Sequence, residues 1–208
     1  MICILGCLDN EAGLSICKEM LEWIEKEHDV FVVHQAPPGS QFEYPAIKRV
    51  LETAVLLNEP VLYLHTKGAG NQIPSYYKER MMAPDVNYPK EAKPEDCQRV
   101  VRMMWKHEFT GDRLKEYLKA VNTNEPVVAC PMTGKERITW QNGWIINPSG
   151  AKELLKTFHK DSNRYYYECM FQNTSIKIKG LISEDCNKSD NHHAKLWNLT
   201  WKFFENSL

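Results

Sequence analysis

The sequence lacks an excess of charge of either sign. Its 208 residues include 26 Lys and Arg against 27 Asp and Glu, so the formal net charge is −1. Proteins that bind nucleic acid over a broad surface carry a basic field, because contacts with phosphates supply much of the affinity. The even balance argues against nucleic acid as the main partner. The length suits one domain with a sizeable core and is short for two.

Long apolar runs are also missing. No stretch approaches the roughly 20 apolar residues that a membrane-spanning helix needs. The apolar start, residues 1–5, is interrupted at positions 9–11 by Asp-Asn-Glu, too early for the core of a signal peptide. We therefore expect a cytoplasmic protein with no transmembrane segment. The glycosylation sequons at Asn173 and Asn198 are then chance matches.

Closely spaced cysteine pairs are absent as well. None of the seven cysteines stands in a C-x-x-C arrangement, which excludes the common zinc spacing and the thioredoxin motif. Scattered cysteines are typical of free thiols in a reducing compartment, several of them packed as small apolar side chains. Cys186, Asp190, His192 and His193 have the residue types of a metal site but no known spacing, and we interpret them as a polar surface loop.

Strand and helix patterns alternate in the first half of the chain. Short apolar runs at residues 1–7, 30–33 and 61–64 are typical of buried strands. The segments between them, 11–27 and 46–58, repeat apolar residues every three or four positions, as amphipathic helices do. This order predicts a single α/β domain with a Rossmann-like, mostly parallel mixed sheet of about six strands, flanked by helices.

The second half is less regular. Residues 71–95 contain four prolines and predict a long loop or lid. Residues 184–208 form a tail that we expect to pack back onto the domain. The remaining elements are predicted as helices from about residue 95 and over 112–121 and 149–158, with strands at 127–130 and 140–146.

Two loops are predicted to face a ligand. In open parallel sheets, ligands bind beyond the carboxyl ends of the strands. The loops that follow the first and third strands are residues 8–12 and 65–70. The second of them reads His-Thr-Lys-Gly-Ala-Gly, and its glycines would let the backbone approach phosphate oxygens closely.

Two motifs carry a resemblance to a known family. Residues 61–70 resemble the place where glycosyltransferases of the GT-A type carry an apolar strand ending in Asp-x-Asp. Residues 140–148, Trp-Gln-Asn-Gly-Trp-Ile-Ile-Asn-Pro, resemble the "Asn-x-Gly, apolar run, Asn" segment of the same enzymes. The string Leu-His-Thr-Lys-Gly, followed by a helix bearing Trp105, is similar to bacterial polysaccharide-biosynthesis proteins of the rhamnan-synthesis type. The resemblance extends over roughly residues 1–170.

The resemblance implies an enzyme that moves a sugar from a nucleotide-sugar donor to a saccharide acceptor. The base and ribose would lie at the first loop, the diphosphate at the second, and the acceptor beside the 71–95 lid. The donor-binding residues that it implies are Asp9, Asn10, Arg49, His65, Thr66, Lys67 and Gly68. The acceptor-binding residues that it implies are Trp105, Asn142 and Trp144, the tryptophans by stacking on sugar rings.

Two residues are candidates for catalysis. An inverting transferase needs a carboxylate or a histidine as general base for the acceptor hydroxyl. Glu168 is the first candidate, with Glu136 and Asp161 behind it, and His65 is the second catalytic candidate because it ends the third strand. An ordinary surface or helix position stays the alternative for Glu168.

The chain departs from the family pattern at the metal motif. His65-x-Lys67 replaces Asp-x-Asp, and a protonated lysine is a poor ligand where Mg²⁺ and Mn²⁺ prefer carboxylate oxygens. Lys67 could instead supply positive charge directly to the departing diphosphate. The sequence therefore predicts metal-independent transfer with no metal ligands, while a Mn²⁺ or Mg²⁺ cofactor stays an alternative.

Other interpretations remain open. The missing acidic pair also suits a non-catalytic carbohydrate- or nucleotide-binding module of the same fold. A third possibility is a phosphate-handling enzyme that uses His65 as nucleophile or acid. Single residues have structural alternatives too: Asn10 as a helix cap, Arg49 as an exposed helix charge, and Trp105 or Trp144 as core. The oligomeric state is not predicted.

Overall fold

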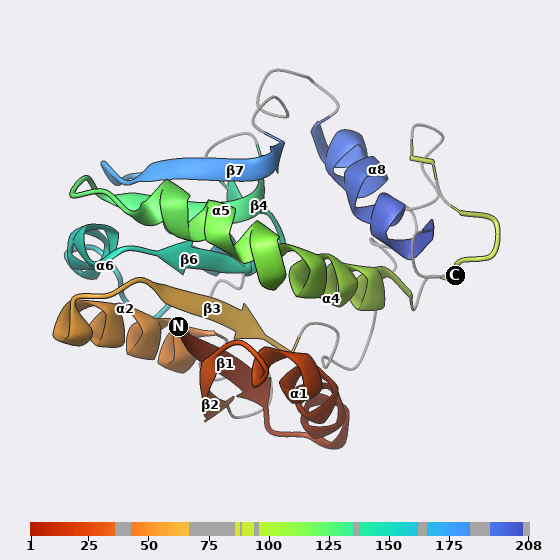
Figure 1. The fold of residues 1–208 in the computed structure, drawn as a ribbon, viewed down its shortest axis with the longest axis horizontal. Helices are drawn as coiled ribbons and strands as arrows, with labels where there is room; N and C mark the ends of the chain where they lie inside the picture. The colour runs from red at the N-terminus through yellow and green to blue at the C-terminus, as the bar shows by residue number, and fades with distance from the viewer. Residues whose placement is uncertain are drawn as a thin grey trace.

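The computed structural model describes residues 1–35, 43–66, 86–87, 89–93, 96–134, 138–161, 166–183 and 192–205. Over these ranges the chain is an α/β domain in which helices flank a mixed sheet (Figure 1). Most of the predicted lid lies outside the described residues, as do Lys67, Gly68 and Glu136.

The first half forms a parallel three-stranded unit, as its alternating pattern predicts. Strand β1 (Ile2–Leu8) lies between β2 (Asp29–Gln35) and β3 (Val61–His65) and pairs with both in parallel. Helix α1 (Glu11–Ile24) connects β1 to β2, and α2 (Tyr44–Leu57) precedes β3. These bounds agree closely with the predicted elements.

The second half adds antiparallel pairing. β6 (Trp144–Ile146) runs antiparallel to both β3 and β4 (Val127–Gly134), and β7 (Lys177–Ser183) pairs with β4 in parallel. The two-residue strand β5 (Ile138–Thr139) folds back on the end of β4. Within the described residues, three of the six strand pairings are antiparallel, so this sheet is mixed rather than mostly parallel. The reason is that the connection from β4 to β6 is too short for the helical crossover that parallel neighbours need.

The remaining helices cover the sheet and extend past its edge (Figure 1). They are α4 (Asp96–Glu108), α5 (Gly111–Val121), α6 (Pro148–Leu155), the short α7 (Tyr166–Cys169) and α8 (His192–Glu205). Within the predicted tail, α8 packs against α4 and β4. No helix of the described part of the chain is both long and apolar enough to cross a lipid bilayer.

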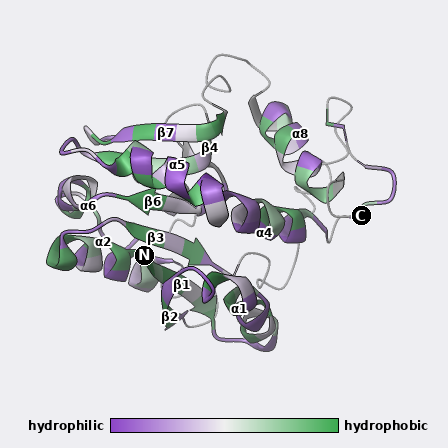
Figure 2. Cartoon of the chain, in the orientation of Figure 1, coloured by the Kyte–Doolittle hydropathy of each residue, from purple (hydrophilic) through white to green (hydrophobic). Residues whose placement is uncertain are grey.

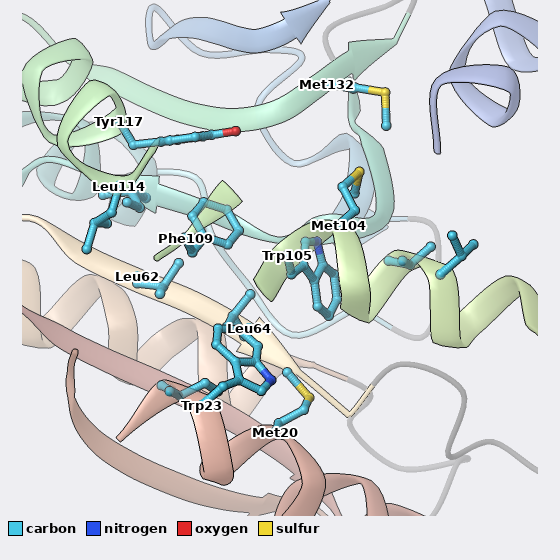
Figure 3. Close-up of a cluster of buried hydrophobic side chains, with 14 of the residues drawn as sticks. Met20, Trp23, Leu62, Leu64, Met104, Trp105, Phe109, Leu114, Tyr117 and Met132 are labelled. Carbon is cyan, nitrogen blue, oxygen red and sulfur yellow. The ribbon is translucent and has the colours of Figure 1, made fainter. Parts of the chain in front are cut away.

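Two separate clusters of apolar side chains lie on the two faces of the sheet. Leu62 and Leu64 of β3 join α1, α4 and α5 on one face, whereas Val61 and Tyr63 join α2 and α6 on the other. Successive side chains of a strand point to opposite faces, so a strand covered on both sides reads as a continuous apolar run. Figure 3 shows the first cluster, and Figure 2 shows apolar strands beneath helices whose outer sides are polar.

The strand predicted over 140–146 is shorter in the structure. Its first three residues form a 3₁₀ turn (Trp140–Asn142), because Gln141 and Asn142 have φ angles of 62° and 58°, which a strand does not allow. β7 is missing from the predictions above. Its signal is the alternation of Ile176 and Ile178 with lysines, which is typical of a strand with one face exposed.

Asn147 joins the end of β6 to α6 and β4 from a fully buried position. Its side-chain oxygen accepts hydrogen bonds from the backbone N–H groups of Val127, at 3.0 Å, and Gly150, at 2.8 Å. Its amide nitrogen donates to the carbonyl oxygens of Thr123 and Glu125, at 2.9 and 2.7 Å. Through these four bonds, one side chain connects the backbone of β4, of the loop before it and of the start of α6.

We predict that Asn147→Ala destabilises the fold strongly, because two buried N–H groups lose their acceptor. Each orphaned group costs about 1–3 kcal/mol, so the free energy of unfolding should fall by roughly 2–4 kcal/mol. Urea denaturation measures this difference. The exposed Asn122→Ala is the control and should change stability by less than about 0.5 kcal/mol. Equal losses in the two variants would contradict the structural role of Asn147.

His28 is a buried titratable group of the fold. Its ring is 6% exposed, and Nε2 donates to the carbonyl oxygen of Phe109 at 2.9 Å. Because a carbonyl only accepts, the neutral ring carries its proton on Nε2. Burial lowers the pKa of His28; the hydrogen bond to Phe109 and the nearby Glu27 and Asp29 act in the opposite direction.

This lowered pKa predicts a dependence of stability on pH. The unfolded chain takes up a proton at the ordinary histidine value, about 6.5, before the folded chain does. The contribution is therefore fully present above that pH and is lost as the pH falls below it. His28→Gln should flatten the fall in urea midpoint between pH 7 and pH 5. The exposed His34→Gln should leave that fall unchanged, and parallel curves for wild type and His28→Gln would refute the prediction.

Candidate functional site

The order in which the chain adds strands to the sheet changes side at β1. From β1 it passes through α1 to β2 on one side, and then returns through α2 to β3 on the other. The two helices cover opposite faces, since their apolar residues belong to different clusters. Ligands bind at such a switch point, in the crevice outside the carboxyl ends of the two strands. The candidate site is therefore where Leu8 and His65 end β1 and β3.

Thr66 links the loops that leave these two strands. Its hydroxyl oxygen accepts a hydrogen bond from the backbone N–H of Leu8 at 3.0 Å, and its own N–H donates to the carbonyl oxygen of Gly6 at 2.8 Å. The side chain is only 6% exposed. Thr66 thus lies at the predicted site and holds its two sides together.

Asp9 and Asn10 follow β1 and lie in different environments. Asn10 is the N-cap of α1, and its side-chain oxygen accepts from the N–H of Gly13 at 2.7 Å. Asp9 is exposed, and its backbone N–H donates to the carbonyl oxygen of Gln35 at 2.8 Å. The structure therefore gives Asn10 a capping role and leaves the Asp9 carboxylate facing solvent beside the switch point.

Glu43, which the predictions above do not include, lies at the centre of the site. It is the residue before α2, and its Oε2 accepts hydrogen bonds from the Tyr63 hydroxyl, at 3.0 Å, and from the Asn142 amide. Its Oε1 lies 3.8 Å from Nε2 of His65. The two side chains are 19% and 12% exposed. A carboxylate and a histidine thus face each other at the end of β3, largely shielded from water.

Aromatic rings fix this pair in place. The His65 ring stacks on Tyr63, with centroids 5.9 Å apart and planes 8° apart, and Trp105 packs against it at 5.4 Å. Trp144 contacts Tyr63 at 4.9 Å and donates its indole N–H to Asn142 at 2.7 Å. Burial, together with Glu43, raises the pKa of Tyr63 well above its ordinary value. The phenol therefore stays protonated, and its O–H donates a hydrogen bond to Glu43.

The burial of the tryptophans corrects their predicted role. Trp105, Asn142 and Trp144 are all 0% exposed. The Trp105 indole lies directly over Gly143, where any side-chain carbon would clash with it. A ring that is covered on all sides offers no face to a sugar, so stacking on an acceptor does not fit these positions. The three residues instead support the Glu43–His65 pair.

Two buried N–H donors near His65 have no hydrogen-bond partner within the described ranges: Nε2 of Gln35 and Nε1 of Trp105. Gln35 ends β2 and is 7% exposed. Its Nε2 lies 2.6 Å from the point where a Cβ on Gly6 would stand, and Cβ of His65 lies 3.4 Å from the same point. Nε1 of Trp105 lies against Gly143, whereas Nε2 of Gln35 lies beside Gly6 and the base of the His65 side chain. Unpartnered buried donors are rare in folded proteins.

The other predicted residues are not part of this cluster. Arg49 is exposed on α2. Glu168 lies in α7, which contacts the 3₁₀ turn, but its side chain is outside the described part. Asp161 faces His159 at 3.4 Å. The described residues contain no group of three His, Cys, Asp or Glu that could hold a metal ion. Glu43 and His65 alone do not make the donor set of a carboxylate-bound Mg²⁺ or Mn²⁺.

Comparison of the chain with protein-family models, with curated proteins and with solved structures finds no match in any of the three. The fold is that of an α/β protein, and its candidate ligand site lies at the ends of β1 and β3. Because such folds host many activities, function has to be argued from the chemistry at that edge.

The hydrogen bond from Asn142 to Glu43 predicts that Asn142→Asp strongly lowers the free energy of unfolding. The substitution keeps the acceptor for Trp144 but replaces the donor to Glu43 with a second carboxylate. We expect a loss of about 3 kcal/mol in the free energy of unfolding at pH 7. The loss should shrink near pH 5, because one proton shared by the two carboxyl groups restores the bond. Urea titrations at both pH values measure it, and a loss that does not depend on pH would contradict this charge contact.

Proposed function

We propose that the chain is a glycosyltransferase that moves a sugar from a nucleotide-sugar donor to a saccharide acceptor in the cytoplasm. The observation that carries this proposal is the position of His65, which ends β3 at the switch point and faces Glu43. The two motifs that resemble GT-A enzymes also lie side by side, since Tyr63 of β3 pairs with Trp144 of β6. Two motifs that are far apart in the sequence thus meet on neighbouring strands of the sheet.

The proposed roles follow from what the reaction needs. The departing nucleoside diphosphate develops negative charge, which fixed cations and N–H donors stabilise. His65, Lys67 and Gly68 would hold the diphosphate at the end of β3. The exposed Asp9 would accept hydrogen bonds from the ribose at the end of β1. Glu168 remains the proposed general base for the acceptor hydroxyl.

A non-catalytic binding module of the same fold is the second candidate. It is favoured by the sequence, in which His65-x-Lys67 stands where GT-A enzymes carry Asp-x-Asp. The two candidates differ in turnover, not in donor binding. Release of the free nucleoside diphosphate on addition of a saccharide acceptor separates them.

The first test is a thermal-shift screen of nucleoside diphosphates and nucleotide sugars, with EDTA or with Mn²⁺. A ligand at 100 times its Kd stabilises the native state by about 2.7 kcal/mol, which raises the melting temperature. We expect one nucleotide sugar to do this in EDTA, with wild type and the exposed control Lys119→Ala but not with Lys67→Ala. A screen without any shift would refute nucleotide-sugar binding and turn the search to free glycans. A shift that requires Mn²⁺ would refute the metal-independent form.

A further inference from the structure

We propose that two copies of this chain pair edge to edge through β2, antiparallel and about a two-fold axis at Val32, so that their two sheets join into one. The partner is therefore a second copy of the chain itself. This inference does not depend on the proposed function, because it concerns the edge strand and the helix beside it rather than any ligand.

β2 is an outer strand of the sheet, next to β1 in Figure 1. Within the described ranges it pairs with β1 alone, in a continuous register from Asp29 to Gln35. Native proteins often block such edges with lysine, proline or a bulge. β2 contains none of these, its middle residues are Val-Phe-Val-Val, and Phe31 is 56% exposed. An open apolar edge of this kind is a template for a further strand.

The backbone of β2 shows which of its groups point outward. The N–H of Asp29 donates to the residue before β1, and the carbonyl oxygen of Gln35 accepts from the residue after β1. Backbone groups of successive residues point to opposite sides of a strand, so the odd positions bond to β1. The even positions, Val30, Val32 and His34, direct their N–H and C=O groups away from the sheet. Among the described residues these groups have no hydrogen-bond partner.

An antiparallel copy centred on Val32 supplies partners for all three positions. Val32 then lies opposite Val32 of the second copy, and Val30 lies opposite His34 of the second copy and the reverse. Opposite residues whose groups point toward each other exchange both N–H···O bonds. In the same register Phe31 lies opposite Val33 of the second copy, an apolar cross-strand pair. The strand is thus complementary to itself over its full length, as a two-fold interface requires.

Helix α1 lies beside this edge and has one flank turned toward it. On its other flank, Glu19 pairs with Arg102 of α4. α4 packs on the side of β3, which lies across β1 from β2. The residues at helical spacing on the flank of α1 toward β2 are Leu14, Lys18, Leu21 and Glu25. This flank therefore joins two leucines with two exposed charges of opposite sign.

The charges on this flank also complement a second copy. The two-fold axis places both α1 helices on the same face of the joined sheet, running antiparallel. Lys18 of one copy is then brought toward Glu25 of the other. Stable interfaces bury roughly 800 Å² per partner, more than a strand pair alone supplies. Leu14, which is 46% exposed, adds apolar area on this face, and Phe31 adds it on the other.

Sedimentation equilibrium of the whole chain, at about 1–100 μM, tests the association. We expect a dimer with a Kd of about 10 μM or tighter. Phe31→Lys should weaken it at least about tenfold, because the two new charges stand diagonally across the axis. Leu56→Lys is the matched control, since Leu56 is an apolar residue of α2 that is 82% exposed. A wild type that stays monomeric throughout overturns the proposal, and so does an equally tight dimer of Phe31→Lys.

The register is tested by cross-linking with diamide, which oxidises two thiols to one disulfide. Directly opposite residues have Cα atoms about 5.5 Å apart, within the range of a disulfide. Val32→Cys should therefore give a covalent dimer. Val30→Cys, on the same face of β2, is the control, because its counterpart lies about 13 Å away along the second strand. Equal cross-linking of the two variants, or of the wild type with its native cysteines, overturns this register.

The helix contact is tested by charge reversal. Lys18→Glu should weaken the dimer by about three- to tenfold, because the symmetric interface contains the pair twice. Adding Glu25→Lys to Lys18→Glu should restore the wild-type Kd. A loss that the second substitution does not restore, or no loss at all, overturns the contact between the α1 helices.

Discussion

The carboxylate of Glu43 is the interaction on which the candidate site depends. A buried carboxylate is costly unless hydrogen-bond donors compensate for the lost water. Tyr63 and Asn142 supply those donors from β3 and from the turn before β6, and thereby fix the start of α2 against the sheet. The same carboxylate places a negative charge 3.8 Å from His65. One side chain therefore ties three segments together where β3 ends.

The antiparallel strand β6 makes this arrangement possible. A short connection from β4 brings residues 140–146 back beside β3, and the left-handed conformations of Gln141 and Asn142 form the turn. Non-glycine residues in that conformation are strained and persist only where the surrounding contacts hold them. Here the bonds from Asn142 to Glu43 and from Trp144 to Asn142 supply such contacts. Gly143, with no side chain, lets the Trp105 indole close over the turn.

Local patterns predicted β1 to β3, α1 and α2, and with them the edge where a ligand would bind. The reason is that the spacing of apolar residues along a buried strand or an amphipathic helix reflects which of its sides is buried. Glu43 could not be found in this way. It lies in a stretch with three prolines and no periodicity, and its partners are 20 and 99 residues away. For Trp105 and Trp144 the error is the opposite one, since the sequence analysis assigned them a site role that the structure does not support. Their residue type suited sugar stacking, but packing between distant elements covers both rings. β7 was missed because its apolar alternation is short.

The burial of the aromatic rings at the end of β3 bears on where a sugar could stack. A site that recognises a sugar offers an open aromatic face and a mixture of donors and acceptors, since each hydroxyl both donates and accepts. At the end of β3 the rings of Trp105 and Trp144 are covered. Glu43, the acceptor in the cluster, already receives two hydrogen bonds. The saccharide acceptor of the proposed reaction is therefore expected away from these two rings.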